Sequence, residues 1–571
     1  MNGERRLIVS ALIGALWIAG ATGSALAGDL HGVVHDAKGA PIAGAIISLA
    51  DDTRGVTENV YSDADGHFHL VTALAGDLSV RVRKFYYDDL RAKVHLTTDA
   101  SIEEDFALVR TSADTDISDN LPAAYHFGQI AFEPGTHFSK DQFQRDCLTC
   151  HQLGNAFTRW NKTAAEWDTI IQRMHAFMGN FDADLREHRA ALLAKAFDGT
   201  PVAVRPVFPF DPLIARAKLV EYRLDDALIP HDAEVGPKDD LIYTVDQQAE
   251  FMAITNLKSG VTEYYPAPHE GMNPGGKFAR QGLPSLLDVY RGPHSLAIGP
   301  DERWYTTDSI ATQIGVFNSR TRQWEKSYDI PGATLYPHTI RVDAKGIVWF
   351  TIIATDQVGR LDPKTGEVKV IALPSGLSKS ISPQDAPYGI DVDPTDGTVW
   401  YAKLYADRIG RIDPVTLKVS EWDSPVKGPR RMRFDRAGDL WVTGYSKGQI
   451  ARITPNAKGF ASKVIDMPEF APGYPAAPYA LGVNPETQEI WVNDAMTDHL
   501  YRYIPEQNRW VAYPMPLRGT YTRDVTFTRE GKVCTANNPI PIAALEGGVA
   551  ELICLDPDGA MPGTPRAEVY H

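Results

Sequence analysis

Apolar and polar residues alternate with a period of two from residue 28 to about residue 110. Short apolar runs such as residues 45–49 are separated by turn residues, among them Asp51-Asp52 and Asp63-Ala64-Asp65-Gly66. This pattern is typical of short antiparallel strands that bury one face. Residues 28–112 are therefore predicted to form a small β-sandwich.

The period changes to that of a helix between residues 123 and 200. Thr163 is placed as an N-cap, with Glu166 in the capping-box position. Apolar residues then recur at helical spacing, at Trp167, Ile170, Ile171 and Met174. A small all-α domain is predicted over residues 123–200, between two β regions.

A repeat begins at about residue 218. Each copy has a Pro, then a histidine, tyrosine or arginine, then a short apolar strand, and most copies are about 40–50 residues apart, as four-stranded propeller blades are. The copies are Pro230-His231, Pro293-His294, Pro337-His338, Pro387-Tyr388, Pro429-Arg430, Pro478-Tyr479 and, without the Pro, Thr522-Arg523. Residues 216–571 are predicted to form a seven-bladed β-propeller, so the chain as a whole is mainly β and multidomain. Either residues 219–224 or residues 567–571 complete the last blade, and we expect the former.

The first 27 residues have the order of a secretory signal peptide. Arg5 and Arg6 precede an apolar run at residues 7–19, and the stretch ends in Ala25-Leu26-Ala27. An uncleaved membrane anchor is the alternative, but the run is shorter than the ~20 residues that a spanning helix needs. We expect cleavage after Ala27, export to a bacterial periplasm, and no transmembrane segment in the mature chain.

Charge and cysteine content exclude two classes of protein. The 571 residues include 73 acidic and 57 basic ones, a net charge of −16, which argues against a nucleic-acid partner. Four cysteines are too few for a disulfide-stapled scaffold.

Two of those cysteines form a C-x-x-C-H motif, Cys147-Leu148-Thr149-Cys150-His151. Such a motif attaches a c-type haem, because each thiol can bond one vinyl group and the adjacent imidazole can bind the iron. One covalent haem c is therefore predicted, with Cys147 and Cys150 as its attachment points and His151 as a ligand of the iron. A zinc or redox CxxC site is the alternative.

The sixth iron ligand is expected from the following helix. Met174 is the first choice, and Met178 and His175 are the alternatives. The segment from Trp160 to Met174 resembles the class I-like cytochrome c domains that are fused to periplasmic propeller dehydrogenases.

The other two cysteines, Cys534 and Cys554, fall on neighbouring strands of the seventh repeat. Antiparallel neighbours bring Cα atoms within disulfide range, and an exported protein meets an oxidising environment. We expect a Cys534–Cys554 disulfide, with two buried free thiols as the alternative.

The residues that follow the recurring Pro should meet at one mouth of the propeller channel. We call them the mouth ring; they are His231, His294, His338, Tyr388, Arg430, Tyr479 and Arg523. None is aliphatic, which indicates a binding or catalytic site more than a solvated pore lining.

Each member of the mouth ring has an expected role. Arg430 and Arg523, with Tyr388 and Tyr479, are predicted to bind an anionic or polar small molecule. The three histidines are predicted to act as a general base or to hold a divalent metal. Asp308 is expected to orient His294 or to join such a metal.

Two further resemblances are carried by motifs. The run from Gly32 to Ala45, followed by the 63–68 turn, resembles the carboxypeptidase-regulatory-like sandwich, which implies a spacer or adhesion module. The repeated Pro-His-x-Ile, Trp-Phe-Thr and Ile-Gly-Arg pattern resembles the virginiamycin B (streptogramin B) lyase family over about residues 218–558.

The lyase family opens a cyclic depsipeptide by metal-assisted elimination, with two histidines on adjacent blades and two glutamates beside the second. The corresponding positions here are Gly292 and Asp308 if His231 and His294 are the pair. They are Tyr336 and Ile352 if His294 and His338 are the pair, so at most one carboxylate is in place.

Three functions follow from these motifs. The first is a periplasmic oxidoreductase that passes electrons from a small polar or anionic organic substrate to the haem, and then to a soluble or membrane-associated redox acceptor. The second is a lyase-like enzyme with an accessory haem. The third is a haem-based binding or sensing protein.

Overall fold

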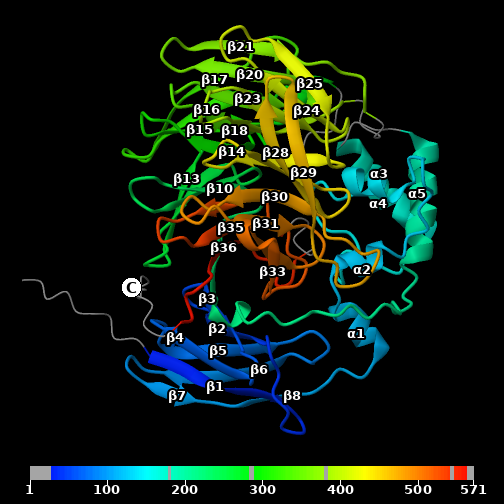
Figure 1. The fold of residues 1–571 in the computed structure, drawn as a ribbon, viewed down its shortest axis with the longest axis vertical. Helices are drawn as coiled ribbons and strands as arrows, with labels where there is room; N and C mark the ends of the chain where they lie inside the picture. The colour runs from blue at the N-terminus through cyan, green and yellow to red at the C-terminus, as the bar shows by residue number, and fades with distance from the viewer. Residues whose placement is uncertain (1–27, 178–181, 282–288, 379–383, 540–544, 562–571) are drawn as a thin grey trace, which may run out of the picture.

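The computed structural model describes residues 28–177, 182–281, 289–378, 384–539 and 545–561. The predicted signal peptide, Met178 and residues 567–571 lie outside this range. The described chain is mainly β, with a sandwich-like N-terminal region, a helical segment and a propeller-like C-terminal part (Figure 1).

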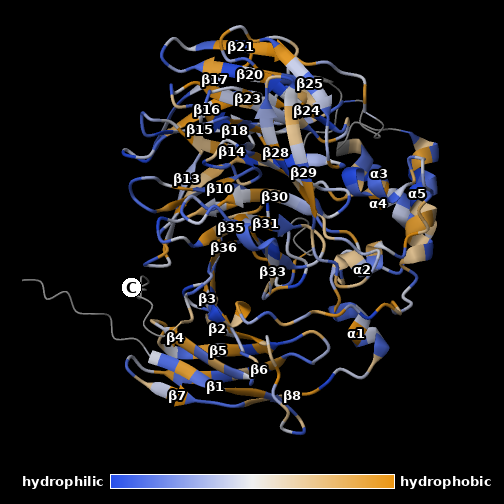
Figure 2. Ribbon diagram, in the orientation of Figure 1, coloured by the Kyte–Doolittle hydropathy of each residue, from blue (hydrophilic) through white to orange (hydrophobic). Residues whose placement is uncertain are grey.

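The N-terminal region has two sheets, as the alternating pattern predicted. The first contains β1 (Gly28–Asp36), β4 (His67–Thr72), β7 (Ser101–Glu103) and β8 (Phe106–Leu108). The second contains β2 (Ile46–Asp51), β3 (Val56–Tyr61), β5 (Gly76–Arg83) and β6 (Leu90–Leu96). Polar and apolar positions alternate along these strands (Figure 2), and the apolar face, with Leu30 and Val34, is buried.

The propeller-like part has six four-stranded antiparallel sheets in the described chain, and each starts at the recurring Pro. Their strands are β10 (Pro230–Val235), β11 (Ile242–Asp246), β12 (Phe251–Thr255), β13 (Thr262–Pro266); β14 (Pro293–Ile298), β15 (Arg303–Asp308), β16 (Gln313–Asn318), β17 (Gln323–Asp329); β18 (Pro337–Val342), β19 (Val348–Ile352), β20 (Gln357–Asp362), β21 (Glu367–Ala372); β22 (Pro387–Val392), β23 (Val399–Lys403), β24 (Arg408–Ile412), β25 (Val419–Asp423); β26 (Pro429–Phe434), β27 (Leu440–Gly444), β28 (Gln449–Asn456), β29 (Gly459–Asp466); and β30 (Pro478–Val483), β31 (Ile490–Asp494), β32 (His499–Ile504), β33 (Arg509–Pro514).

A seventh set of strands closes the ring. It consists of β34 (Thr526–Phe527), β35 (Val533–Asn537), β36 (Glu551–Asp556) and β9 (Lys218–Arg223). β9 pairs with β36 on one edge, as expected for residues 219–224, and with β3 of the sandwich on the other edge. The sandwich and the ring therefore share one continuous eight-stranded sheet.

The repeated tryptophan packs against the arginine of the third strand in four of the described blades, the third to the sixth. Trp349 of β19 is fully buried and lies opposite Arg360 of β20, whose guanidinium stacks 5.8 Å above the indole. A Cβ at Gly359 would lie 2.1 Å from the Phe350 ring, so only glycine fits there. The motif thus follows from cation–π pairing and close aromatic packing.

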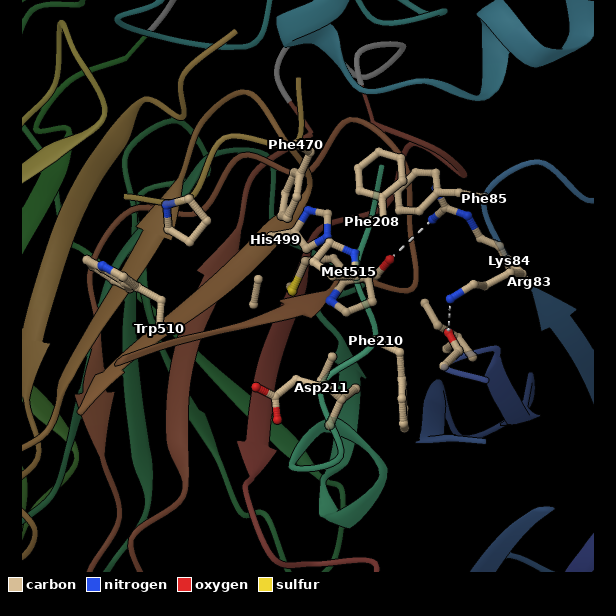
Figure 3. Close-up of a pocket in the computed structure, with 17 residues that line it drawn as sticks. Arg83, Lys84, Phe85, Phe208, Phe210, Asp211, Phe470, His499, Trp510 and Met515 are labelled. Carbon is tan, nitrogen blue, oxygen red and sulfur yellow. Dashed lines mark hydrogen bonds between the residues drawn. The ribbon is translucent and has the colours of Figure 1, made fainter. Parts of the chain in front are cut away.

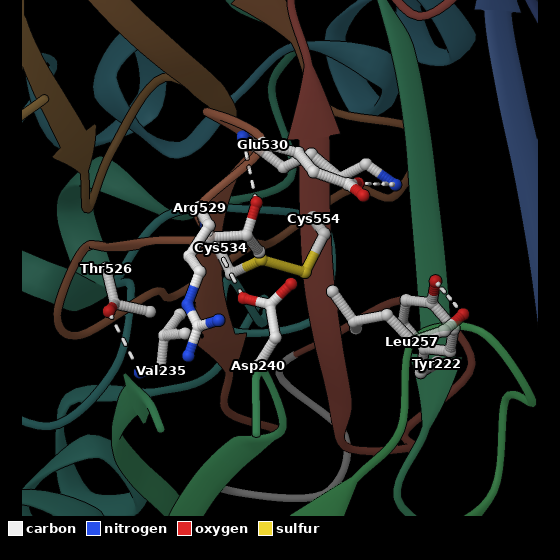
Figure 4. Close-up of a disulfide and its surroundings, with 11 residues drawn as sticks. Tyr222, Val235, Asp240, Leu257, Thr526, Arg529, Glu530, Cys534 and Cys554 are labelled. Carbon is white, nitrogen blue, oxygen red and sulfur yellow. Dashed lines mark hydrogen bonds and ion pairs between the residues drawn. A yellow bond between two sulfur atoms is a disulfide. The ribbon is translucent and has the colours of Figure 1, made fainter. Parts of the chain in front are cut away.

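The disulfide expected in the seventh blade is present. Cys534 and Cys554 lie directly opposite each other on β35 and β36, with their Cα atoms 4.1 Å apart (Figure 4). Both side chains are buried, so the bridge ties two neighbouring strands inside the blade.

The helical segment packs against the propeller-like part, and the described residues do not show a distinct cytochrome domain, so the domain expected over residues 123–200 stays a prediction. Its helices are α1 (Asp114–Asn120), α2 (Ala123–Phe127), α3 (Lys140–Cys147), α4 (Ala164–Phe177) and α5 (Ala183–Ala196). Their buried side chains, such as Phe143 and Trp167, belong to the same apolar cluster as Tyr388 and Tyr479 of the propeller-like part. The helices therefore complete a core that they share with the blades.

No helix in the described ranges is long and apolar enough to cross a membrane.

Candidate functional site

A β-bulge recurs at the start of the inner strand in six blades. The register between the inner and second strands shifts just after the Pro, for example between Pro230 and Ala233 and between Pro429 and Met432. A bulge re-aims the side chains around it. In the first and fifth blades the second residue after the Pro is charged, and Asp232 and Arg431 pair with each other across the channel, so a second layer of polar side chains lies beside the first.

The mouth ring is assembled as the repeat predicted, and all seven of its side chains are buried. The His231 and His294 rings have centroids 3.5 Å apart, those of His294 and His338 are 4.2 Å apart, and those of His338 and Tyr388 are 4.1 Å apart. The hydroxyls of Tyr388 and Tyr479 are 2.8 Å apart and share a hydrogen bond. The blades thus bring these distant residues together.

The three imidazoles contact one another with tilted ring planes, at 36° between His231 and His294 and 48° between His294 and His338. Among the described residues, no group of three or more His, Cys, Asp or Glu side chains is arranged to hold a metal ion. Burial lowers the pKa of all three imidazoles, that of His231 to about 3. The three imidazoles are therefore neutral at neutral pH. We had expected a general base that titrates near pH 7, and this buried environment does not support one.

The two arginines of the mouth ring bind phenols. Arg430 Nη2 donates to the Tyr388 hydroxyl at 2.7 Å, and Arg523 Nη1 donates to that of Tyr479 at 3.0 Å. Burial by itself would raise the pKa of Tyr479, but Arg523, Arg430 and the neighbouring Arg431 outweigh it and lower that pKa to about 8. Tyr479 is thus acidic enough to ionise in mildly alkaline solution.

The C-x-x-C-H motif lies directly over the mouth ring. The Leu148 carbonyl accepts hydrogen bonds from the hydroxyls of Tyr445 at 2.7 Å and Tyr521 at 2.5 Å. Arg523 Nη2 donates to the Cys150 carbonyl at 3.0 Å, and both ring arginines approach the Thr149 carbonyl at 3.4 Å. The sequence analysis identified both features but missed their contact. It also missed two tyrosines. Tyr445 directly follows β27, the second strand of the fifth blade, and Tyr521 lies two residues before Arg523.

The motif has the groups that a haem attachment needs. Cys147 ends α3, and Cys147 and Cys150 are both free thiols. His151 Nδ1 donates to the Gln152 carbonyl at 2.6 Å, which leaves the Nε2 lone pair available. Ligating histidines are commonly fixed in this way.

Among the described side chains of α4, Trp167, Ile171 and His175 are buried and lie one turn apart, and Met174 is half-buried beside them. His175 Nε2 accepts from Arg189 at 3.4 Å, so its lone pair is engaged. Burial and the arginine also lower the pKa of His175 to about 4. Met174 is therefore better placed than His175 to offer a free lone pair.

Asp308 does not orient His294 as we expected. Its carboxylate accepts hydrogen bonds from Arg291 Nε at 2.8 Å and Nη2 at 2.5 Å, and another from the Thr306 hydroxyl. The ion pair is fully buried, which fixes the carboxylate on the second blade. Sequence spacing gave no sign of this arginine, which precedes the Pro by two residues.

A second set of charged side chains lies immediately below the mouth ring. We call it the channel layer; its members are Asp232, Arg341, Arg431, Arg433 and Asp524. Arg431 forms two hydrogen bonds with Asp232, at 2.7 and 2.9 Å, and lies 3.3 Å from Asp524. His231 Nδ1 donates to Asp232 at 2.9 Å, which connects the two layers. Reading the repeat one position further would have found Asp232, Arg431 and Asp524.

Comparisons with known proteins match separate parts of the chain. The virginiamycin B lyase family matches residues 285–464, and the carboxypeptidase regulatory-like domain matches residues 29–109. A virginiamycin B lyase from Nocardia farcinica is 30% identical over 135 residues, which are 23% of this chain and 42% of that protein. The chain thus aligns with less than half of the length of this curated relative.

Solved structures resemble the propeller-like part. A virginiamycin B lyase from Staphylococcus aureus is 19% identical, with 59% of this chain and 99% of that chain covered and a TM-score of 0.47. Kuenenia stuttgartiensis hydrazine synthase is 12% identical, with 57% and 95% covered and a TM-score of 0.44. The described chain is thus mainly β, with a part similar to carboxypeptidase regulatory-like domains before a part similar to virginiamycin B lyases.

Proposed function

We propose that this chain is an exported, haem c-bearing oxidoreductase in which the mouth ring and the motif at residues 147–151 form one site. The observation that carries the proposal is the set of hydrogen bonds from Tyr445, Tyr521, Arg430 and Arg523 to the motif's carbonyl groups. A connecting loop without a role in the site would not require four buried polar side chains from the centre of the blades.

The residues of the motif fit the group that they are proposed to hold. Cys147 and Cys150 would carry the thioether bonds, and His151 would bind iron through Nε2. Met174 would supply a further iron ligand, because the lone pair of His175 faces Arg189. When bound, a haem c supplies a one-electron acceptor.

The mouth ring retains capacity for an anionic substrate. In the described chain, neither Arg430 nor Arg523 has a carboxylate within ion-pair distance, and Arg430 Nε and Nη1 are buried without a hydrogen-bond partner. Buried cations in this state favour an anion or a phenolate. His294 Nδ1, also unpartnered, is proposed to hydrogen-bond the substrate, and Tyr479 is proposed to exchange a proton with it.

The test is covalent haem content. The full-length protein would be produced in bacteria that mature c-type cytochromes and analysed by intact mass and haem staining after denaturation. We expect one haem per chain in the wild type, none in C147S/C150S, and full incorporation in the matched control C534S/C554S. A wild-type protein without covalent haem would overturn the proposal.

Substrate reduction of the haem is the next measurement. Anaerobic addition of small organic anions should give the reduced haem spectrum if the protein is an oxidoreductase. Spectral change on binding without turnover would instead favour the sensing function.

A lyase-like activity is the second candidate, and the match of residues 285–464 to the virginiamycin B lyase family favours it. The site itself supports it less well, because Asp308, the one carboxylate at the corresponding positions, is bound by Arg291. Ring opening of a streptogramin B-type depsipeptide by the wild type and by C147S/C150S, but not by H294A, would establish this activity without the haem.

A further inference from the structure

A cavity of about 150 Å³ lies where the sandwich, the linker at residues 206–211 and the sixth blade meet (Figure 3). One of its walls is aromatic. The rings of Phe85 and Phe208 stack with centroids 4.0 Å apart, and Phe208 is 5.0 Å from Phe470. Three separate parts of the chain therefore build one aromatic surface.

The size of the cavity limits its ligand. An internal cavity of about 150 Å³ holds one benzene-sized molecule. A single six-membered ring therefore fits this volume.

Two cationic side chains beside the cavity indicate that the ligand also carries an anionic group. Arg83, which is 4% exposed, donates through Nη1 to the carbonyls of Met515 at 3.2 Å and Pro516 at 2.8 Å. The Lys84 ammonium donates to the Gly44 carbonyl at 3.2 Å. Over the described ranges, no carboxylate lies within ion-pair distance of either cation.

The remaining ionisable groups of the wall do not compensate this charge. Asp211 is already bound by Arg509 at 2.6 Å. Burial lowers the pKa of His499 to about 3, so that ring is neutral. Burial also lowers the pKa of Lys84, to about 8, because it is desolvated next to the aromatic wall. An apolar cavity with two unpaired cations is unfavourable unless an anion enters it.

We infer that this cavity binds a small aromatic carboxylate with a single ring. Its ring packs on Phe208 and Phe470, and its carboxylate accepts hydrogen bonds from Arg83 and Lys84. This site is far from the motif in the sequence and does not depend on the proposed haem.

Benzoate is the probe for calorimetric titration and thermal denaturation of the full-length protein, with acetate and benzyl alcohol as analogues that lack the ring or the charge. We expect benzoate to bind and raise the melting temperature, and both analogues to bind at least about tenfold more weakly. Equal binding of either analogue, or no binding of benzoate, would overturn the inference.

Two variants locate the site. K84M should weaken benzoate binding about tenfold by removing one charge-assisted hydrogen bond, while K463M, which removes an exposed lysine of β29, should not. A512L should fill the cavity and block binding while it keeps the stability of the fold. Unchanged benzoate affinity in a folded K84M or A512L protein would refute this location.

Discussion

The two layers of the propeller channel are built from similar residues but differ in how their charges are paired. In the channel layer, Arg431 and Arg433 contact carboxylates, chiefly Asp232 and Asp524. In the mouth ring, the contacts of Arg430 and Arg523 with the described residues are to phenols and main-chain carbonyls. Arg430 and Arg431 are neighbours in sequence, yet they belong to different layers.

This difference separates a structural role from a binding role. A buried cation with a carboxylate partner is balanced within the protein, and removing one partner leaves the other charge uncompensated. A buried cation that contacts only neutral oxygens keeps affinity for an anion. An anionic ligand should therefore bind more tightly to the mouth ring than to the channel layer.

The largest effect is expected for Arg431→Met. The substitution leaves Asp232 and Asp524 buried with less compensation and should lower the free energy of unfolding by about 3–5 kcal/mol. Chemical denaturation measures the change, and the double variant D232N/R431M should recover part of it. A loss below about 1 kcal/mol would show that the channel layer is not structural.

Arg430→Met should cost less stability, about 1–3 kcal/mol, because hydrogen bonds to Tyr388 and the Thr149 carbonyl and a contact with the Tyr479 ring are lost, but no ion pair is broken. Its main effect should be on the motif, where amide hydrogen exchange of residues 148–152 should become faster. If R431M accelerated exchange at the motif as much as R430M does, the proposed division between the layers would be wrong.

The pH dependence of stability should reveal Tyr479. Its pKa is about 8 in the folded protein and about 10 in the unfolded chain, so the ionised phenolate favours the folded state. Its contribution should be absent below pH 8 and grow from pH 8 to pH 10. The difference in unfolding free energy between the wild type and Y479F should therefore increase over this range, and a constant difference would contradict the role of the arginines.

The smallest effect is expected for Tyr521→Phe. One hydrogen bond to the Leu148 carbonyl is lost while that from Tyr445 remains, so unfolding should become easier by about 1 kcal/mol. The double variant Y445F/Y521F should exceed the sum of the single changes, because it leaves the carbonyl without a donor. If the two losses of unfolding free energy were strictly additive, the two hydroxyls would not act on the same carbonyl.

Much of the fold could be predicted because the repeat carries local information. The Pro at the start of each inner strand, the buried Trp and the Ile-Gly-Arg motif each reflect contacts within or beside one blade. The sequence could not show whether the helices at residues 123–200 have a core of their own. Phe143 and Trp167 would look the same in a separate core and in the core that they share with Tyr388.

The candidate site was predictable only in part. The repeat identified the mouth ring, since equivalent positions of blades converge by symmetry. Arg291, which binds Asp308, and Tyr521, which binds the motif, lie outside the repeated positions, so only the folded chain shows their contacts. The contact of His231 with His294 depends on rotamers, which the sequence does not specify.

The shared sheet has a consequence for the handling of this protein. β9 closes the ring, and its outer edge is covered by β3 of the sandwich through main-chain hydrogen bonds. A shortened chain that starts after residue 112 would keep every blade but expose that edge, and an uncovered strand edge invites pairing with another molecule. By covering the edge of β9, the N-terminal region should therefore reduce aggregation of the protein.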